Sequence, residues 1–256
     1  MKYRFSTTLN AVLCDADDLL TLWGLARLFQ SAADNHSSSL GVGFEQLQKE
    51  NRAWIITSVY YSMLRRPAVG EELTVETWAK THNGLVAPRD YMLLDSKGNV
   101  CASGLSNWVI FNTEKRTVCR LGSFIDAYET DSDCAADEDI SKKIVLPESM
   151  KLLKEIEIPY SSIDHTRHVN NSEYIKWICD SSPIVCCDNK ISTNNCEMDI
   201  KVNYIRETPY SEGKVNLFTS IPTNGKGEIQ SNDTTFYSVT HNHGVAVNAV
   251  LRFKNI

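Results

Sequence analysis

Hydrophobic residues along the first half of the chain follow a helical period and then a strand period. From residue 19 onward, apolar side chains recur every three or four positions, and a polar segment ending at Gly41 closes this predicted helix. Its apolar face consists of Leu19, Leu22, Trp23, Ala26 and Phe29. The segments 52–64, 73–79 and 89–111 are instead rich in β-branched and aromatic residues, and the last turns at Asp95–Gly98. One helix followed by antiparallel strands predicts an α+β fold.

The second half repeats this order of elements. Residues 155–158 alternate as a strand, and 197–207 and 236–253 do so after an intervening helix. The apolar face of that helix consists of Tyr174, Trp177 and Ile178. Turn residues also recur in similar contexts: Pro67 and Pro209 lie 142 residues apart, and the corresponding hairpin glycines lie 146 apart. This near-constant offset predicts an internal repeat.

An acidic stretch separates the two halves. Residues 126–139 contain seven acidic side chains and almost nothing to bury, which is typical of a solvated linker. We therefore expect an N-terminal unit over 1–125, a linker over 126–150 and a C-terminal unit over 151–256.

Composition excludes several classes of protein. A hydrophobic content of 42% and a charged content of 23% are those of a soluble globular protein, and no apolar run reaches the ~20 residues of a membrane span. The first residues carry no apolar leader, and the eight cysteines are scattered, so we expect free thiols and a cytoplasmic location. The net charge of −6 argues against general nucleic-acid binding.

Residues 161–180 gather most of the candidate chemistry. Asn170 and Glu173 have the spacing of a helix capping box, so His168 sits on the turn that feeds a helix N-terminus, a good place to stabilise an oxyanion. A polar turn with a good cap explains these residues equally well. A metal site at His165 and His168 is disfavoured, because the two rings do not share a helical face, and we expect no metal.

The remaining catalytic options are narrow. Cys179 falls well inside the predicted helix and is expected to be a core residue, while His241 and His243 fall where a hairpin must turn. The chain has no G-x-S-x-G nucleophile motif and no glycine-rich phosphate loop. Water activated by a carboxylate and an imidazole is the chemistry that remains. Glu207 is a second polar candidate, although strand alternation puts it opposite Tyr204 unless a bulge intervenes.

These segments resemble the acyl-[acyl-carrier-protein] thioesterases of plants and bacteria. The family motif Asp-x-Asn-x-His-Val-Asn-Asn, followed by a helix with Tyr and Trp, is matched by residues 164–171 and the helix after them. The family segment Glu-Tyr-x-x-Glu-Cys is matched by 203–208, and LFQSAADNHSSSLGVG resembles its N-terminal part. The resemblance covers nearly the whole chain. It implies a tandem hotdog fold, in which the N-terminal half holds the acyl chain and the C-terminal half carries the catalytic residues.

The resemblance also assigns the site residues. It makes Asp164, His168 and Glu207 catalytic, with Asn170 and Asn171 as the pair that opens the helix and faces the oxyanion. Two positions depart from the family. Thr166 stands where the family has a catalytic Asn, and Thr208 stands where many members have Cys, so no cysteine nucleophile acts at that position. A threonine offers one hydroxyl donor in place of an amide.

The function that the resemblance implies is hydrolysis of fatty acyl-carrier-protein thioesters, which terminates fatty acid synthesis without a cofactor. The partner is a carrier protein with a phosphopantetheine-linked acyl group, and the base is Glu207 or His168 with Asp164. An acyl-CoA thioesterase and a non-catalytic acyl-binding protein are the alternatives. A carrier protein is acidic, so we consider Arg65, Arg66, Lys142 and Lys143 as a docking patch. A monomer and a homodimer are both compatible with the sequence.

Overall fold

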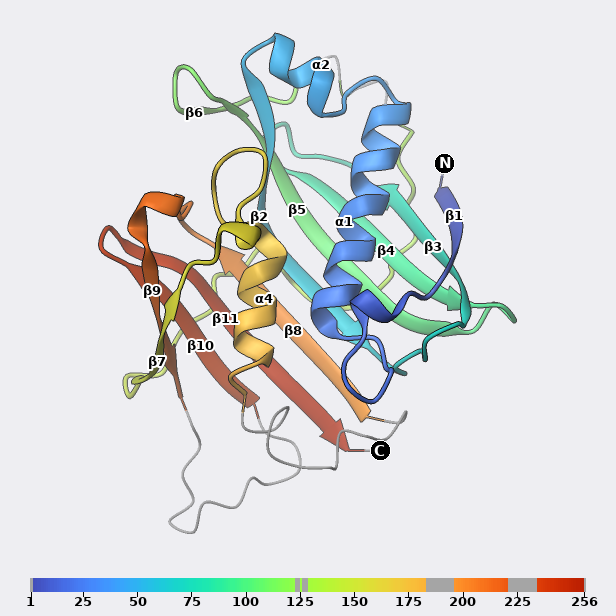
Figure 1. Cartoon of the computed structure of the whole chain (residues 1–256). Helices are drawn as coiled ribbons and strands as arrows, with labels where there is room; N and C mark the ends of the chain where they lie inside the picture. The colour runs from blue at the N-terminus through green and yellow to red at the C-terminus, as the bar shows by residue number, and fades with distance from the viewer. Residues whose placement is uncertain (1, 123–124, 126–128, 183–195, 221–233, 256) are drawn as a thin grey trace.

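One antiparallel sheet with the two longest helices, α1 and α4, on the same face forms most of the described structure (Figure 1). The computed structural model describes residues 2–122, 125, 129–182, 196–220 and 234–255. The first half contains β1 (Tyr3–Thr8), η1 (Ala11–Leu13), α1 (Leu22–Ser39), α2 (Phe44–Lys49), β2 (Arg52–Met63), β3 (Glu72–Ala79), β4 (Ala87–Asp95), β5 (Val100–Asn112) and β6 (Thr117–Cys119). The second half contains β7 (Lys151–Glu157), η2 (Tyr160–Ser162), α4 (Asn171–Cys179), β8 (Cys196–Tyr204), η3 (Tyr210–Glu212), β9 (Lys214–Thr219), β10 (Thr234–His241) and β11 (Gly244–Asn255).

The strand order shows the internal repeat. The sheet runs β1-β3-β4-β5-β2-β8-β11-β10-β9-β7, so each half places its strands in the same order outward from the centre. The central pair, β2 and β8, is antiparallel, with Ser58 opposite Asn203 and Met63 opposite Met198. Each half therefore wraps its sheet around one helix, which confirms the α+β class and the tandem hotdog that the sequence predicted.

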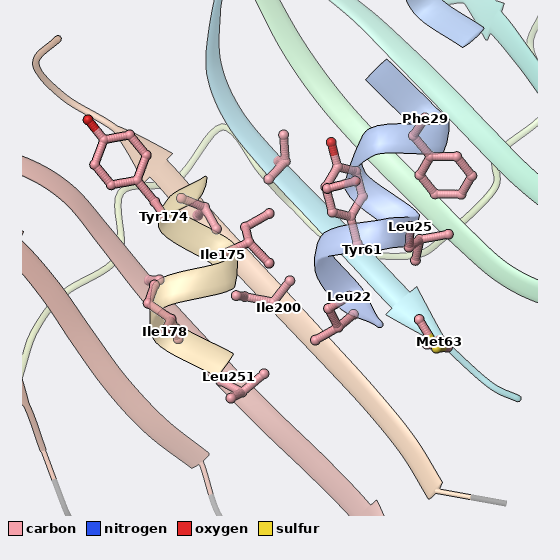
Figure 2. Close-up of a cluster of buried hydrophobic side chains, with 14 of the residues drawn as sticks. Leu22, Leu25, Phe29, Tyr61, Met63, Tyr174, Ile175, Ile178, Ile200 and Leu251 are labelled. Atoms are coloured by element: carbon pink, nitrogen blue, oxygen red, sulfur yellow. The ribbon is translucent and has the colours of Figure 1, made fainter. Parts of the chain in front are cut away.

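The main hydrophobic core extends across both halves. Figure 2 shows side chains of α1 and α4 gathered over the central strands, with Leu22 and Ile175 among them and Ile200 on β8 beneath. The predicted face of 197–207 is confirmed, since Met198, Ile200 and Val202 are all buried. Between the helices, the indole nitrogen of Trp23 donates to a carboxylate oxygen of Glu173 at 3.0 Å. The two helices are thereby held side by side.

Gly104 shows how closely α1 packs on its sheet. A Cβ added there would lie 2.8 Å from the rings of both Phe29 and Tyr61, so only glycine fits. Because the main chain of β5 can approach Phe29 this closely, the ring also stacks on Tyr91, with centroids 4.8 Å apart.

The predicted helix begins three residues later than the apolar pattern suggested. Thr21 is its N-cap and accepts from the main chain of Gly24, while Leu19 forms a bridge with Ala68 instead of a first helical turn. The apolar pattern placed the helix start too early because Leu19 is buried, as are many of the helix residues that follow it. The edge strand β1 was not predicted.

The described part of the acidic connection is attached to the sheet, in contrast to the solvated linker expected. Ile140 packs with Tyr60 on the face opposite the helices, and the Lys201 ammonium binds a Glu138 carboxylate oxygen at 2.8 Å. Among the helices of the described residues, none is long and apolar enough to cross a membrane.

Candidate active site

The loop between η2 and α4 folds into a tight turn. The N–H of Asp164 donates to the carbonyl of His168 at 2.9 Å, and Ile163 and Val169 form a β-bridge at its base. Arg167 takes a left-handed conformation with φ of 67°, which lets the chain reverse within a few residues. The turn keeps Asp164 and His168 on one short segment.

Thr166 connects the aspartate to the histidine. Its hydroxyl donates to Oδ1 of Asp164 at 2.5 Å, and its Oγ1 lies 3.3 Å from Nδ1 of His168. Because the single hydroxyl proton is given to Asp164, the bond to the ring requires a proton on Nδ1. The other ring nitrogen, Nε2, then carries the lone pair in the neutral tautomer. Thr166 therefore orients the imidazole, and its hydroxyl is not free to donate to an oxyanion.

Glu207 reaches this loop because β8 ends in an irregularity. The N–H groups of Ile205 and Arg206 both donate to the carbonyl of Ala246, at 2.8 and 3.2 Å, so two residues oppose one. The alternation that would have turned Glu207 away is broken there. Its Oε2 lies 3.5 Å from Nε2 of His168, and the side chains are 40% and 30% exposed.

The main chain holds these two segments together. The N–H of Val169 donates to the carbonyl of Thr208 at 2.9 Å, and His168 forms a β-bridge with Pro209. The histidine and the glutamate are thus placed by backbone pairing as well as by their side chains. Thr208 itself is fully buried.

The N-terminus of α4 begins as predicted, with one difference. Asn170 is the N-cap, and its side chain accepts from the N–H of Ser172 at 3.0 Å. The expected return bond of a capping box is absent, because the N–H of Asn170 donates to Ser162 and the Glu173 carboxylate accepts from Trp23. The N–H of Asn171, the first helical residue, has no acceptor among the described residues.

The first half of the chain contributes side chains that sequence reasoning missed. Arg116, beside β6, places a guanidinium nitrogen 3.9 Å from Oε2 of Glu207. Phe44, at the start of α2, packs edge-on against the ring of His165 with centroids 4.3 Å apart. Neither contact could be predicted from a local sequence pattern, because each joins residues from different halves of the chain.

The corresponding turn of the first half has the same backbone pairing and conformation, but it has a leucine where the second half has His168. Cys14 and Leu20 form its β-bridge, and Asp18 takes the left-handed conformation, with φ of 58°. Leu19 bridges Ala68 there, as His168 bridges Pro209, so a leucine occupies the place of the histidine.

Two pockets lie beside this region. The larger, about 510 Å³ and partly open to solvent, lies between α1 and its sheet. Just over half of its lining residues are apolar, namely Ala33, Trp54, Ala79, Ala87, Pro88, Trp108 and Ile125, and its charged members are Asp34, Lys80 and Arg89. The smaller, about 280 Å³, is lined by Asn171, Ser172 and Tyr204, and Trp108 lines it too. The indole of Trp108 therefore borders both spaces.

Asp34 is the most electrostatically perturbed carboxylate of the larger pocket. Its side chain is open to solvent on one side, but desolvation by the surrounding walls raises its pKa to about 6, against smaller opposing effects of His165 and Arg89. Asp34 is therefore within electrostatic range of His165, on the loop that precedes α4.

Other candidate residues lie away from the loop. Cys179 ends α4 and packs against the core, and the described cysteines, Cys14, Cys101, Cys119, Cys134 and Cys179, form no disulfide. Glu212, His241 and His243, which the sequence did not connect, bring potential metal-ligand atoms within 4.8 Å of one another.

Two models of one family match the chain. The acyl-ACP thioesterase N-terminal domain matches residues 2–128, and the acyl-ACP thioesterase C-terminal domain matches residues 147–252. The chain belongs to the acyl-ACP thioesterase family. The resemblance drawn from residues 164–171 and 203–208 is thereby confirmed.

Curated members of the family are similar over much of the chain. A chloroplastic palmitoyl-acyl carrier protein thioesterase of Gossypium hirsutum is 29% identical over 66% of this chain and 44% of its own length. Chloroplastic oleoyl-acyl carrier protein thioesterase 1 of Arabidopsis thaliana is 25% identical over 90% of this chain and 70% of its own length. The match to the cotton relative thus covers less than half of that protein.

Solved structures of the family share the fold. An acyl-ACP thioesterase from Bacteroides thetaiotaomicron superposes with a TM-score of 0.83 at 21% identity, covering 99% of this chain and 98% of that one. The 12:0-ACP thioesterase from Umbellularia californica gives a TM-score of 0.78 at 17% identity, covering 99% and 97%. Both chains share the whole double-hotdog arrangement with this family member.

The raised pKa of Asp34 predicts a specific pH dependence of stability. A carboxyl with a folded pKa above its unfolded value of 3.8 favours folding at low pH, and that contribution is lost as the pH rises to about 6 and beyond. Asp34→Asn should therefore gain stability relative to the unaltered protein between about pH 4 and pH 7, with no gain below. Melting temperatures of both proteins across this range measure the difference. A pH-independent difference would contradict the assignment.

Proposed function

We propose that this protein hydrolyses fatty acyl-carrier-protein thioesters, releasing a free fatty acid and the phosphopantetheine thiol of the carrier, and so terminates fatty acid synthesis. One observation carries the proposal: Nε2 of His168 and Oε2 of Glu207 face each other at 3.5 Å beside the N-terminus of α4. That spacing suits a water molecule held by both groups. The family relationship supplies the thioester as substrate.

His168 acts as the general base in this proposal. Asp164 and the Thr166 hydroxyl hold a proton on its Nδ1, which leaves Nε2 to take a proton from the attacking water. Glu207 orients that water and stabilises the imidazolium that forms. This arrangement has the logic of a catalytic triad, with a threonine hydroxyl inserted between the carboxylate and the imidazole.

The N-terminus of α4 stabilises the oxyanion. Attack converts the thioester carbonyl into a tetrahedral intermediate, whose negative oxygen needs a hydrogen-bond donor. The unpartnered N–H of Asn171 and the dipole of α4 provide that environment, with Asn170 fixing the helix start. When the carbon–sulfur bond breaks, the imidazolium of His168 returns its proton to the departing sulfur.

The acyl chain occupies the first half of the protein. From a carbonyl beside Asn171, the chain enters the smaller pocket, passes Trp108 and extends into the larger pocket beneath α1. The mainly apolar surface of the larger pocket suits a hydrocarbon tail, and the mixed lining of the smaller one suits the polar thioester end. The N-terminal residues 1–125 thus hold the tail, and residues 151–256 supply the reacting groups, with 126–150 as the connection between them.

Exposed arginines at the active site form the docking surface for the carrier. Arg167 and Arg206 flank His168 and Glu207 in sequence, and Arg116 lies against Glu207. Together these positive charges suit an acidic carrier protein. The earlier candidate Arg66 is wrong, because its side chain is 3% exposed and paired with Asp15.

We further place the reaction in the cytoplasm, where exposed thiols such as Cys134 remain reduced. The paired halves already form one continuous sheet within one chain, which makes a monomer sufficient for activity.

Thiol release from acyl-carrier thioesters of increasing chain length tests the proposal, with the acyl-CoA series alongside. The protein should favour the carrier-bound series, and His168→Ala should lose roughly 10²–10⁴-fold in rate. Thr166→Ser should keep most of the activity, whereas Thr166→Val should lower kcat because the imidazole loses its orienting bond. The matched Ser and Val variants separate hydroxyl chemistry from side-chain shape. Normal turnover by His168→Ala, or saturable acyl binding without any turnover, would overturn the assignment.

Carrier docking is tested by neutralising charges at two places. The double variant Arg167→Ser, Arg206→Ser should raise KM for carrier-bound substrates several-fold and leave KM for acyl-CoA almost unchanged. The matched control is Lys142→Ser, Lys143→Ser, which removes the same charge from the connection between the halves and should change neither KM. An equal effect of both double variants would show that docking depends only on net charge.

A further inference from the structure

A compact cluster of one carboxylate and two imidazoles lies behind the segment that carries Glu207. Glu212 comes from η3, His241 ends β10 and His243 lies in the turn before β11. Oε1 of Glu212 is 3.4 Å from Nδ1 of His241 and 2.5 Å from Nδ1 of His243. Three potential ligand atoms from two separate segments thus converge on one point.

The surroundings of Glu212 and His241 favour the protonation states that metal ligation needs. Burial favours the neutral acid at Glu212, but hydrogen bonds from His243 and Asn242 outweigh it and lower the pKa of this carboxyl. Burial lowers the pKa of His241, whose side chain is 1% exposed. Metal ligation requires an ionised carboxylate and neutral imidazoles, so little proton loss is needed at these two residues.

We propose that Glu212, His241 and His243 bind a divalent transition-metal ion of the zinc class, with solvent as the fourth ligand. Zinc–ligand bonds of about 2.0–2.1 Å in a tetrahedron separate ligand atoms by roughly 3.4 Å, which is the present separation of the Glu212 and His241 atoms. To reach the same separation from Glu212, the His243 atom must move outward from its present 2.5 Å. Its side chain is 71% exposed in a short turn, which leaves room on the solvent side for this movement.

Surrounding groups would orient the ligands. Both the main-chain and side-chain nitrogens of Asn242 donate to Oε2 of Glu212, at 3.2 and 3.0 Å, which leaves Oε1 for the metal. Nε2 of His241 is buried and has no hydrogen-bond partner among the described residues, and the nearby main chain of Glu207 has a small raising effect on the pKa of the ring. Zinc-binding histidines commonly donate from their second nitrogen to such a neighbouring carbonyl.

Two existing contacts have to give way on binding, the first of them the hydrogen bond between Nδ1 of His243 and Oε1 of Glu212. In the second, the N–H of His243 now donates to Nδ1 of His241 at 3.1 Å, and that lone pair would turn to the metal instead. Without metal, the same residues form hydrogen bonds that join the β10–β11 hairpin to η3. Zinc binding would replace these hydrogen bonds with metal–ligand bonds.

Metal binding would fasten the catalytic segment to the hairpin. The chain from Glu207 to Glu212 is short, and His241 contacts its Glu212 end. A metal at this place would touch no reacting atom, so its effect is on the rigidity of the segment that carries Glu207.

Zinc titration of chelator-treated, metal-free protein tests the proposal by calorimetry and thermal melting. One zinc ion per chain should bind, and the melting temperature should rise with zinc concentration. His243→Ala, at an exposed position that leaves the fold intact, should weaken this binding at least tenfold, as should Glu212→Gln. His82→Ala, a histidine outside the cluster, should bind zinc like the unaltered protein.

Cobalt separates this site from the free thiols, which also bind zinc. Thiolate ligation produces a strong near-ultraviolet charge-transfer band, whereas a carboxylate–imidazole site does not. The band-free cobalt signal should disappear in His243→Ala. Equal zinc affinity of the unaltered protein and His243→Ala would overturn the proposal, as would a loss of melting temperature in His243→Ala that is the same with and without zinc. These readouts are independent of thioester hydrolysis.

Discussion

The antiparallel pairing of β2 with β8 joins two repeats into one sheet, and the position of each site residue depends on that join. It aligns Ser58 with Asn203 and places both long helices on one face, where Trp23 of α1 binds Glu173 of α4. The hydrophobic core is consequently shared by the two halves. Without this pairing, the catalytic loop of the second half would have no wall formed by the first.

The turns before α1 and α4 have the same backbone pairing but different side-chain contacts. In the first half, the turn before the helix is locked by an ion pair of Asp15 with Arg66, and a buried leucine follows. In the second half, the equivalent segment exposes His168 to Glu207. Because Leu19 pairs with Ala68 as His168 pairs with Pro209, Arg66 occupies the place of Glu207, and it binds Asp15 where the second half leaves the corresponding Asp164 to Thr166. The two halves therefore share one scaffold, and the residues at a few corresponding positions of it differ.

Local patterns predicted what local forces determine. The helix cap at Asn170, the buried face of β8 and the hairpin before Gly244 all follow from spacing within a few residues. The sequence indicated only that a bulge would be needed to bring Glu207 to the histidine, and it did not place that bulge at Ile205. Its cause is pairing with Ala246, far along the chain.

The features that sequence reasoning missed depend on contacts between distant segments. Phe44 contacts His165, and Arg116 contacts Glu207, only when the two halves are joined in one sheet. The role of Thr166 is a similar case. Family comparison marks it as a lost amide, whereas its bonds to Asp164 and His168 make it an orienting group. Glu173 was read as a local cap and instead joins two helices, because tertiary contact outweighed the capping pattern.

The central claim is that one half activates water while the other holds the acyl chain. The most direct measurement is a structure of the protein bound to a carrier protein whose acyl group is attached through a non-hydrolysable amide. The account predicts the amide carbonyl within hydrogen-bond distance of the Asn171 N–H and the tail running past Trp108 towards Asp34. A tail lying in the second half, or a carbonyl remote from His168, would contradict it.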